Sequence, residues 1–96
     1  MALKIVWTPQ AEIGLQGVIH YLEEDWTVRE IHQLEKNIHE FLKVISSYPK
    51  LYQATKKLNN VRKGIVDKNN YVIYRIDCDK QIIEIVNFRS TRQRPI

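Results

Sequence analysis

The side chains of this chain that could carry chemistry are basic, and they lie in its second half. They are Lys50, Lys56, Lys57, Arg62, Lys63, Lys68, Arg75, Arg89, Arg92 and Arg94, interleaved with Tyr48, Tyr52, Tyr71, Tyr74 and Phe88. Arginine pairs with two oxygens of a phosphate or carboxylate, and aromatic rings stack on bases. The pattern indicates a surface that binds an anionic partner, although a solvated sheet face with half-buried tyrosines has the same composition.

The end of the sequence, VNFRSTRQRPI, concentrates this pattern. Arg89 and Arg92 directly follow an apolar segment, so we expect a buried strand to hold them in place, Arg89 above all. Arg94 and Ile96 lie beyond the expected strand and are typical of a frayed basic tail.

Other kinds of chemistry find little support in the sequence. His20, His32 and His39 lie on expected helices, and no two of them have the i, i+4 spacing of a helical zinc site. Cys78 lies in an expected turn between two aspartates, whose negative charges disfavour a reactive thiolate. We therefore predict no metal site and no cofactor.

The composition bounds the class of protein. The chain has 96 residues, of which 44% are hydrophobic and 27% charged, as in an ordinary globular domain. This length supports one core, so we predict a single domain over residues 1–96. The net charge of +4 favours an anionic partner. We expect a cytoplasmic protein, because the sequence shows neither the apolar segment of a signal peptide nor a membrane span.

A helix is expected to begin at Thr8 and Pro9. Threonine caps free backbone amides, and proline at the first helical position loses no hydrogen bond. Apolar residues then recur at helical spacing as far as Glu24. Gly14 and Gly17 lower the helix propensity, and on a helix face such glycines are typical of close approach to a neighbouring element.

The rest of the chain predicts a second helix and a sheet. A capping box begins a helix over residues 27–47, and its short connection to the first helix indicates an antiparallel hairpin. Residues 61–66, 71–76 and 82–88 are rich in β-branched and aromatic side chains and are separated by turn residues. Residues 3–7 can join the edge of this sheet.

We therefore predict an α+β fold in the order β-α-α-β-β-β. A helical hairpin packs on one face of a four-stranded antiparallel sheet, and the other face is available for binding. The core is expected to come from Leu15, Val18, Leu22, Leu34, Ile38, Phe41, Ile73, Ile83 and Ile85.

Three segments follow one another along the chain in a distinctive order and spacing: IVWTPQAEIGLQGVIHYLEEDW, VRKGIVDKNNYVIYRI and IIEIVNFRSTRQRP. Their most specific parts are the Trp-Thr-x-x-Ala opening, Tyr-x-x-Tyr-Arg at residues 71–75 and Arg-Gln-x-Pro at residues 92–95. On these motifs, nearly the entire chain resembles the RelE/ParE superfamily of type II toxins. The closing motif is similar to that of ParE-like and plasmid-stabilisation proteins. The resemblance implies the fold predicted above and a cognate acidic antitoxin as partner in a hetero-oligomer.

The resemblance also implies one of two activities. ParE-like toxins poison DNA gyrase, whereas RelE-like toxins are ribosome-dependent mRNA endonucleases that use basic residues on the sheet face and a tyrosine or histidine near the C-terminus. Arg62 and Arg89 match basic positions of the RelE-like pattern, but Tyr71 and Gly64 replace two others. No histidine, tyrosine or carboxylate follows Phe88, and arginine is a poor general acid or base because it stays protonated.

We therefore predict a growth-inhibiting toxin of the ParE-like kind that inhibits DNA gyrase and is neutralised by an antitoxin. The alternative is a RelE-like endonuclease that acts on mRNA at the ribosome. The predicted target-binding residues are Arg62, Tyr71, Arg75, Arg89 and Arg92, and the catalytic candidates of a ribonuclease are Arg62, Lys63 and Arg89.

Overall fold

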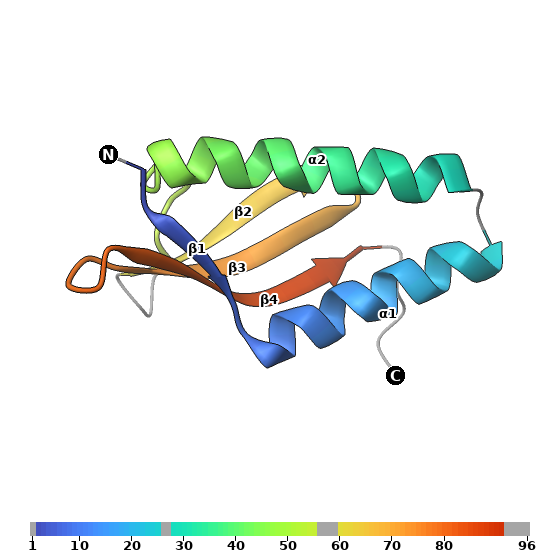
Figure 1. Ribbon diagram of the computed structural model, residues 1–96, viewed down its shortest axis with the longest axis horizontal. Helices are drawn as coiled ribbons and strands as arrows, with labels where there is room; N and C mark the ends of the chain where they lie inside the picture. Colours follow the sequence, from blue (N-terminus) through green and yellow to red (C-terminus); the bar gives the residue numbers. More distant parts are fainter. Residues whose placement is uncertain (1, 26–27, 56–59, 92–96) are drawn as a thin grey trace.

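A computed structural model describes residues 2–25, 28–55 and 60–91 of the chain. Its elements are β1 (Lys4–Trp7), α1 (Pro9–Asp25), α2 (Val28–Ser47), β2 (Val61–Asp67), β3 (Asn70–Asp77) and β4 (Ile82–Ser90). Figure 1 shows α1 and α2 running in opposite directions beside the sheet. The α+β class and the element order confirm the prediction. None of the helices in the described part of the chain has the length and apolar character that crossing a membrane requires.

The sheet is mixed, with the strand order β1-β4-β3-β2. β2, β3 and β4 form the expected antiparallel meander, but β1 runs parallel to β4, with Ile5 opposite Ile83 and Trp7 opposite Ile85. The predicted all-antiparallel sheet is therefore wrong for β1. No tight hairpin joins β1 to β4, and a long connection through other elements permits a parallel pair.

A β-bulge interrupts the pairing of β3 with β4. Ile73 lies opposite Asn87, whereas the next residue of β3, Tyr74, lies opposite Ile85. Val86 is therefore an extra residue of β4. Because side chains alternate between the two faces of a strand, the extra residue reverses which positions of β4 point toward the helices.

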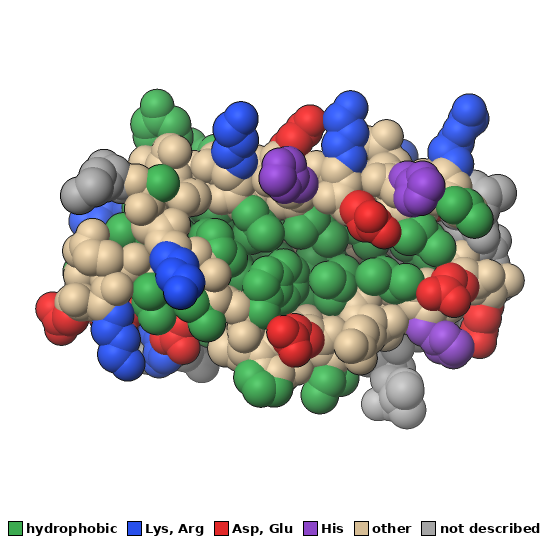
Figure 2. Space-filling view, in the orientation of Figure 1, with side chains coloured by type: hydrophobic (Ala, Val, Ile, Leu, Met, Phe, Trp, Pro, Cys, Tyr) green, Lys and Arg blue, Asp and Glu red, His purple; other side chains and the backbone are tan. Residues whose placement is uncertain are grey.

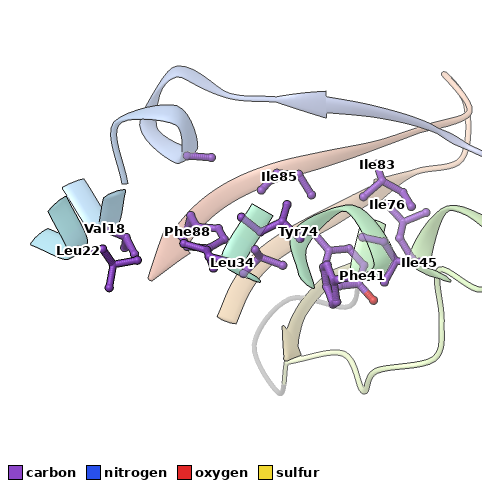
Figure 3. Close-up of a cluster of buried hydrophobic side chains, with 13 residues drawn as sticks. Val18, Leu22, Leu34, Phe41, Ile45, Tyr74, Ile76, Ile83, Ile85 and Phe88 are labelled. Carbon is purple, nitrogen blue, oxygen red and sulfur yellow. The ribbon is translucent and has the colours of Figure 1, made fainter. Parts of the chain in front are cut away.

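The core lies between the two helices and one face of the sheet (Figure 3). Its buried side chains are Ala11, Val18, Leu22, Leu34, Ile38, Phe41, Ile45, Val72, Tyr74, Ile76, Ile83, Ile85 and Phe88. Most of the expected core residues are among them, and Leu15 packs against them while partly exposed. Ile73 was wrongly placed in the core, because its neighbours Val72 and Tyr74 point toward the helices and Ile73 must point to the other face.

The start of α1 is held against β4. Thr8 caps the helix as predicted, because its Oγ1 accepts a hydrogen bond from the amide of Ala11 at 3.2 Å. The same hydroxyl donates to the carbonyl oxygen of Ile85 at 2.8 Å. Two turns later, a Cβ atom on Gly14 would lie 2.4 Å from the backbone oxygen of Phe88. The close approach expected of this glycine is therefore confirmed.

The contact at Gly14 predicts opposite effects of alanine at the two glycines of α1. Gly14→Ala should lower the free energy of unfolding by about 1–3 kcal/mol, because the added methyl group meets a backbone atom that cannot move aside. Gly17 is exposed on the same helix, so Gly17→Ala should raise stability by up to about 1 kcal/mol through helix propensity. Thermal and urea unfolding of both variants measure this difference. Equal effects of the two substitutions would contradict the docking of α1 at Gly14.

Candidate functional site

The position of Gly64 decides which face of the sheet each residue of β2 occupies. A Cβ atom on Gly64 would lie 2.4 Å from Cζ of Phe41, so Gly64 lies directly beneath the aromatic ring of Phe41, a residue of α2. Because side chains alternate along a strand, Arg62 points to the same, helix-covered side. Lys63 and Ile65 point to the opposite side, which we call the open face. Ile65 is 47% exposed there.

Arg62 belongs to a network beneath the helices. Its Nη1 donates to the carbonyl oxygen of Tyr52, and its Nε is buried without a partner in the described structure. The Tyr74 hydroxyl donates to the carbonyl of Pro49 at 2.8 Å, and the Tyr52 hydroxyl donates to that of Ile65 at 3.1 Å. Burial raises the pKa of Tyr74 to about 12, and the charge of Arg62 offsets part of the rise. These bonds hold the segment before β2 across the outer edge of that strand.

Two cations flank one aromatic ring on the open face. The Lys63 Nζ lies 4.3 Å from the centroid of the Tyr71 ring, within the range of a cation–π contact. Arg89 lies directly opposite Tyr71 on the neighbouring strand and is exposed. We call Lys63, Tyr71 and Arg89 the open-face cluster. The bulge at Val86 is what turns Arg89 to this face, because it places the preceding Phe88 in the core.

The cations of the open face differ in whether they are paired. Arg75 donates through Nε to Oε1 of Glu84 at 3.0 Å and also through Nη2 to the same oxygen. This hydrogen bond and the carboxylate charge raise the pKa of Arg75 above its ordinary value. Among residues 2–25, 28–55 and 60–91, neither Lys63 nor Arg89 forms an ion pair with an acidic side chain. The open-face cluster therefore has unpaired positive charge that can bind an anion.

The structure brings together some of the predicted site residues and separates others. Tyr71, Arg75 and Arg89 share the open face with Lys63, whereas Arg62 lies on the other side of the sheet. Arg92 lies outside the described residues. Gly64 also faces the helices, so the basic position implied there by the resemblance would not lie on the open face. The sequence analysis did not identify Ile65 as an exposed residue of the open face. Strict alternation from a buried Gly64 would have placed it there.

The remaining candidates of the sequence do not form a site. Cys78 is exposed in the turn between β3 and β4. His20 and Glu24 form an exposed pair on α1, with Nε2 and Oε1 3.2 Å apart. In the part of the chain that the structure describes, no group of three or more His, Cys, Asp or Glu side chains could hold a metal ion.

Solved structures share this fold. The chromosomal ParDE toxin–antitoxin system from P. aeruginosa matches with a TM-score of 0.74 at 13% identity, covering 95% of this chain and 98% of that one. The toxin–antitoxin complex RelBE2 from Mycobacterium tuberculosis matches with a TM-score of 0.66 at 15% identity, covering 94% of this chain and 99% of that one. A double mutant of E. coli toxin RelE in the free state matches with a TM-score of 0.59 at 12% identity, covering 96% and 86%. No curated protein is similar enough in sequence to count as a match.

The helical hairpin on a mixed sheet with an open, basic face thus defines a fold of the RelE/ParE class. A family model described as the ParE toxin of the type II toxin–antitoxin system parDE matches residues 5–95. The chain belongs to this ParE toxin family. The resemblance found in the sequence is therefore confirmed.

The two sides of the sheet predict different consequences for two arginines. Arg62→Ala should lower the free energy of unfolding by about 1–3 kcal/mol, because it removes a charged donor to a part-buried carbonyl and the packing of its stem. Arg89→Ala should change stability by less than about 0.5 kcal/mol, because that side chain is exposed and unpaired. Urea unfolding of both variants checks the assignment. A stable Arg62→Ala protein would show that Arg62 does not support the fold.

Proposed function

We propose that this chain is the toxin of a type II toxin–antitoxin module and that it inhibits DNA gyrase. The observation that carries the choice of target is the separation of the basic residues that the RelE-like pattern requires together. Arg62 lies beneath the helices and Arg89 lies on the open face, so the two cannot act on one phosphodiester group. Membership of the ParE toxin family supports the same choice.

The open face supports recognition better than proton transfer. General acid–base catalysis needs a group that changes its protonation near neutral pH within reach of the reacting atom. The basic and phenolic groups of this face are lysine, arginine and tyrosine. Of its carboxylates, Glu84 is bonded by Arg75, and Asp77 accepts a hydrogen bond from the amide of Lys80. Arginine and lysine instead supply charged hydrogen-bond donors to an anionic surface. We assign target binding to Arg89, Lys63 and Tyr71, with Arg75 beside them and Arg92 as a further contact beyond the described residues.

One observation favours a second candidate function, ribosome-dependent cleavage of mRNA. Lys63 and Arg89 lie on either side of Tyr71, so a phosphate above the ring would meet two cations and a phenol. In that case the cations stabilise charge at the phosphate and Tyr71 acts as the acid or base. Arg62 has no place in such a site. The two candidates therefore share the same surface and differ in the reaction.

The proposal includes an acidic antitoxin that neutralises the toxin. Figure 2 shows a band of hydrophobic side chains in the hollow between α2 and α1, with charged side chains on its rims. A pocket of about 400 Å³ in this region is lined by Ile5, His39, Leu42, Lys43 and Ser46. An amphipathic segment fits such a hollow, because its apolar anchors enter the hollow while its polar residues meet the charged rims, where Lys43 can pair with an acidic residue.

The two edges of the sheet are unequal for a partner that adds a strand. The Thr55 amide donates to the carbonyl of Val61, and the Tyr52 hydroxyl donates to the carbonyl of Ile65. The segment that contains Tyr52 and Thr55 therefore covers the edge of β2. On the other edge, the amide of Lys4 donates to the carbonyl of Gln81 and that of Thr8 to the carbonyl of Ile85. Because backbone amides alternate in direction along a strand, those of Ile5 and Trp7 point away from β4. The edge of β1 is therefore the better place for an extended antitoxin segment.

The gyrase assay tests the target. The purified chain should inhibit supercoiling by DNA gyrase, and Arg89→Ala should weaken this inhibition roughly ten- to a hundredfold, as expected for a lost charged hydrogen bond. Arg89→Lys should restore it in part, because an ammonium group cannot reproduce a bidentate contact. Arg29→Ala, which removes an exposed arginine from α2, is the matched control and should have no effect.

Translation reactions with purified ribosomes, run beside the gyrase assay, distinguish the second candidate. Cleavage of mRNA within the ribosomal A-site codon, together with untouched gyrase supercoiling, would show that the gyrase proposal is wrong. Tyr71→Phe should then abolish cleavage. Arg62→Ala should lose activity only to the extent that the variant is unfolded.

The antitoxin is tested by co-expression with the short reading frame beside the toxin gene. The partner should rescue growth and co-purify, and the complex should weaken with salt without dissociating fully, because apolar anchors remain. Leu42→Glu should weaken binding by at least about tenfold through a charge in the apolar hollow. Val44→Glu on the same helix, outside the Leu42 pocket and already 42% exposed, is the control. Equal effects of the two variants would exclude the hollow as the binding site.

A further inference from the structure

Exposed hydrophobic side chains gather at the outer edge of β2, beside the open-face cluster and away from the hollow between the helices. The described residues include six large hydrophobic side chains that are exposed, and four of them lie here. They are Val44 near the end of α2, Tyr48 and Leu51 after that helix, and Ile65 on β2. We call these four residues the edge patch. Single exposed hydrophobic residues are ordinary, whereas a contiguous group of them indicates contact with a partner.

The edge patch is contiguous because hydrogen bonds connect its members. The amide of Tyr48 donates to the carbonyl of Val44 at 2.8 Å, and the amide of Leu51 donates to the carbonyl of Tyr48 at 3.1 Å. The Tyr52 hydroxyl donates to the carbonyl of Ile65. A pocket of about 190 Å³ lies between α2 and β2, and its lining includes Val44, Tyr52 and Ile65. A side chain that enters this pocket therefore contacts the helix, the strand and the segment between them.

The part of the chain that forms this edge is basic. Residues 41–66 contain six lysine or arginine residues and no aspartate or glutamate. Among the described residues that line the pocket, Glu40 is the one carboxylate. Complementary charge favours an acidic partner, whereas a second copy of this chain would bring like charges together.

The edge patch joins the open-face cluster at Ile65. In the pairing of β2 with β3, Ile65 lies directly opposite Tyr71, and the Lys63 Nζ lies 4.3 Å from the centroid of the same ring. Side chains that lie opposite each other on one face of a sheet are in contact. A partner that pairs with Lys63 and Arg89 therefore also covers Ile65. The antitoxin segment proposed for β1 lies at the other edge of the sheet, because β1 and β2 are its two outer strands.

We propose that the edge patch and the open-face cluster together bind an acidic protein segment that carries apolar side chains beside its carboxylates. The identity of the partner rests on the proposed function: the segment belongs to a protein subunit of DNA gyrase rather than to the DNA that gyrase holds. Its carboxylates meet Lys63 and Arg89, and an apolar side chain enters the pocket between α2 and β2. Contacts with a phosphate backbone are polar, so exposed aliphatic side chains add nothing to them.

Binding of the full chain to purified DNA gyrase without DNA tests the proposal. Ile65→Ser and Val44→Ser should each weaken binding roughly three- to tenfold, because each removes an apolar contact that binding buries. Ile13→Ser and Val28→Ser are the matched controls and should have no effect, since these side chains are 68% and 67% exposed on other parts of the surface. Thermal unfolding of each variant shows whether it is folded at the temperature of the assay.

A pair of charged substitutions at Tyr48 tests the acidic character of the partner. Tyr48→Lys should retain more affinity for gyrase than Tyr48→Glu, because a lysine attracts the carboxylates of the partner and a glutamate repels them. An equal loss in both variants would show that the partner is not acidic at this point.

The outcomes separate this proposal from that of the gyrase target. If the parent chain inhibits supercoiling while Ile65→Ser and Val44→Ser behave like the controls, gyrase remains the target and the edge patch is not part of the interface. If the parent chain neither binds nor inhibits gyrase, both proposals are wrong.

Two further results would assign the surface to another partner and overturn the proposal. One is binding that requires DNA and is equally strong to the DNA alone, which would identify nucleic acid as the partner. The other is a dimer of the parent chain in analytical ultracentrifugation that Ile65→Ser dissociates, which would identify a second copy.

Discussion

The contact between the Phe41 ring and Gly64 is the constraint on which the rest of the structure depends. No side chain fits between α2 and β2 at this point, so the helix lies directly on the strand backbone. Once Gly64 faces the helices, alternation assigns every other residue of β2 to a face. Arg62 becomes a support for the segment that covers the edge of the sheet, and Lys63 becomes part of the open face. One packing contact therefore determines which basic residues can meet a target.

The positive charge of the chain is distributed in a way that separates two kinds of surface. On the open face, Arg75 is neutralised by Glu84, and the unpaired charge is concentrated at Lys63 and Arg89 around Tyr71. Near the hairpin connection, Glu30 and Asp67 line a pocket in which the amides of Asn37 and Asn70 donate to the Asp67 carboxylate. The first surface has free charge for an anionic target, whereas in the second the hydrogen bonds connect α2 to the turn between β2 and β3.

Much of the fold follows from local patterns in the sequence. Thr8 and Pro9 specify a helix start, and the structure has the corresponding bond from the Ala11 amide. The parallel pairing of β1 does not follow from local patterns, because a short apolar strand with a long connection fits either direction. Ile73 was assigned to the core because apolar residues lie on both sides of β3, which removes the alternation that would have identified its face.

The candidate site was predicted in part, for similar physical reasons. Tyr71, Arg75 and Arg89 were identified from residue type and do share a face. Adjacent residues of a strand point to opposite faces, so Arg62 and Lys63 could have been separated from the sequence once the burial of Gly64 was known. The contact of Asn37 with Asp67 could not be predicted, because the two residues meet only through the packing of α2 over the β2–β3 turn.

The extra residue at Val86 has a consequence for how relatives of this chain are compared. A bulge acts as a change of parity: if the same residues of β4 alternated regularly with no bulge at Val86, Phe88 would be turned to solvent and Arg89 toward the helices. A relative with the same number of residues in this strand but no bulge would thus exchange a buried position for an exposed one without altering the amino-acid composition. Two family members can therefore carry an arginine in the same aligned column and present it to opposite sides of the sheet. Pairing with β3, rather than position in an alignment, identifies the equivalent residue.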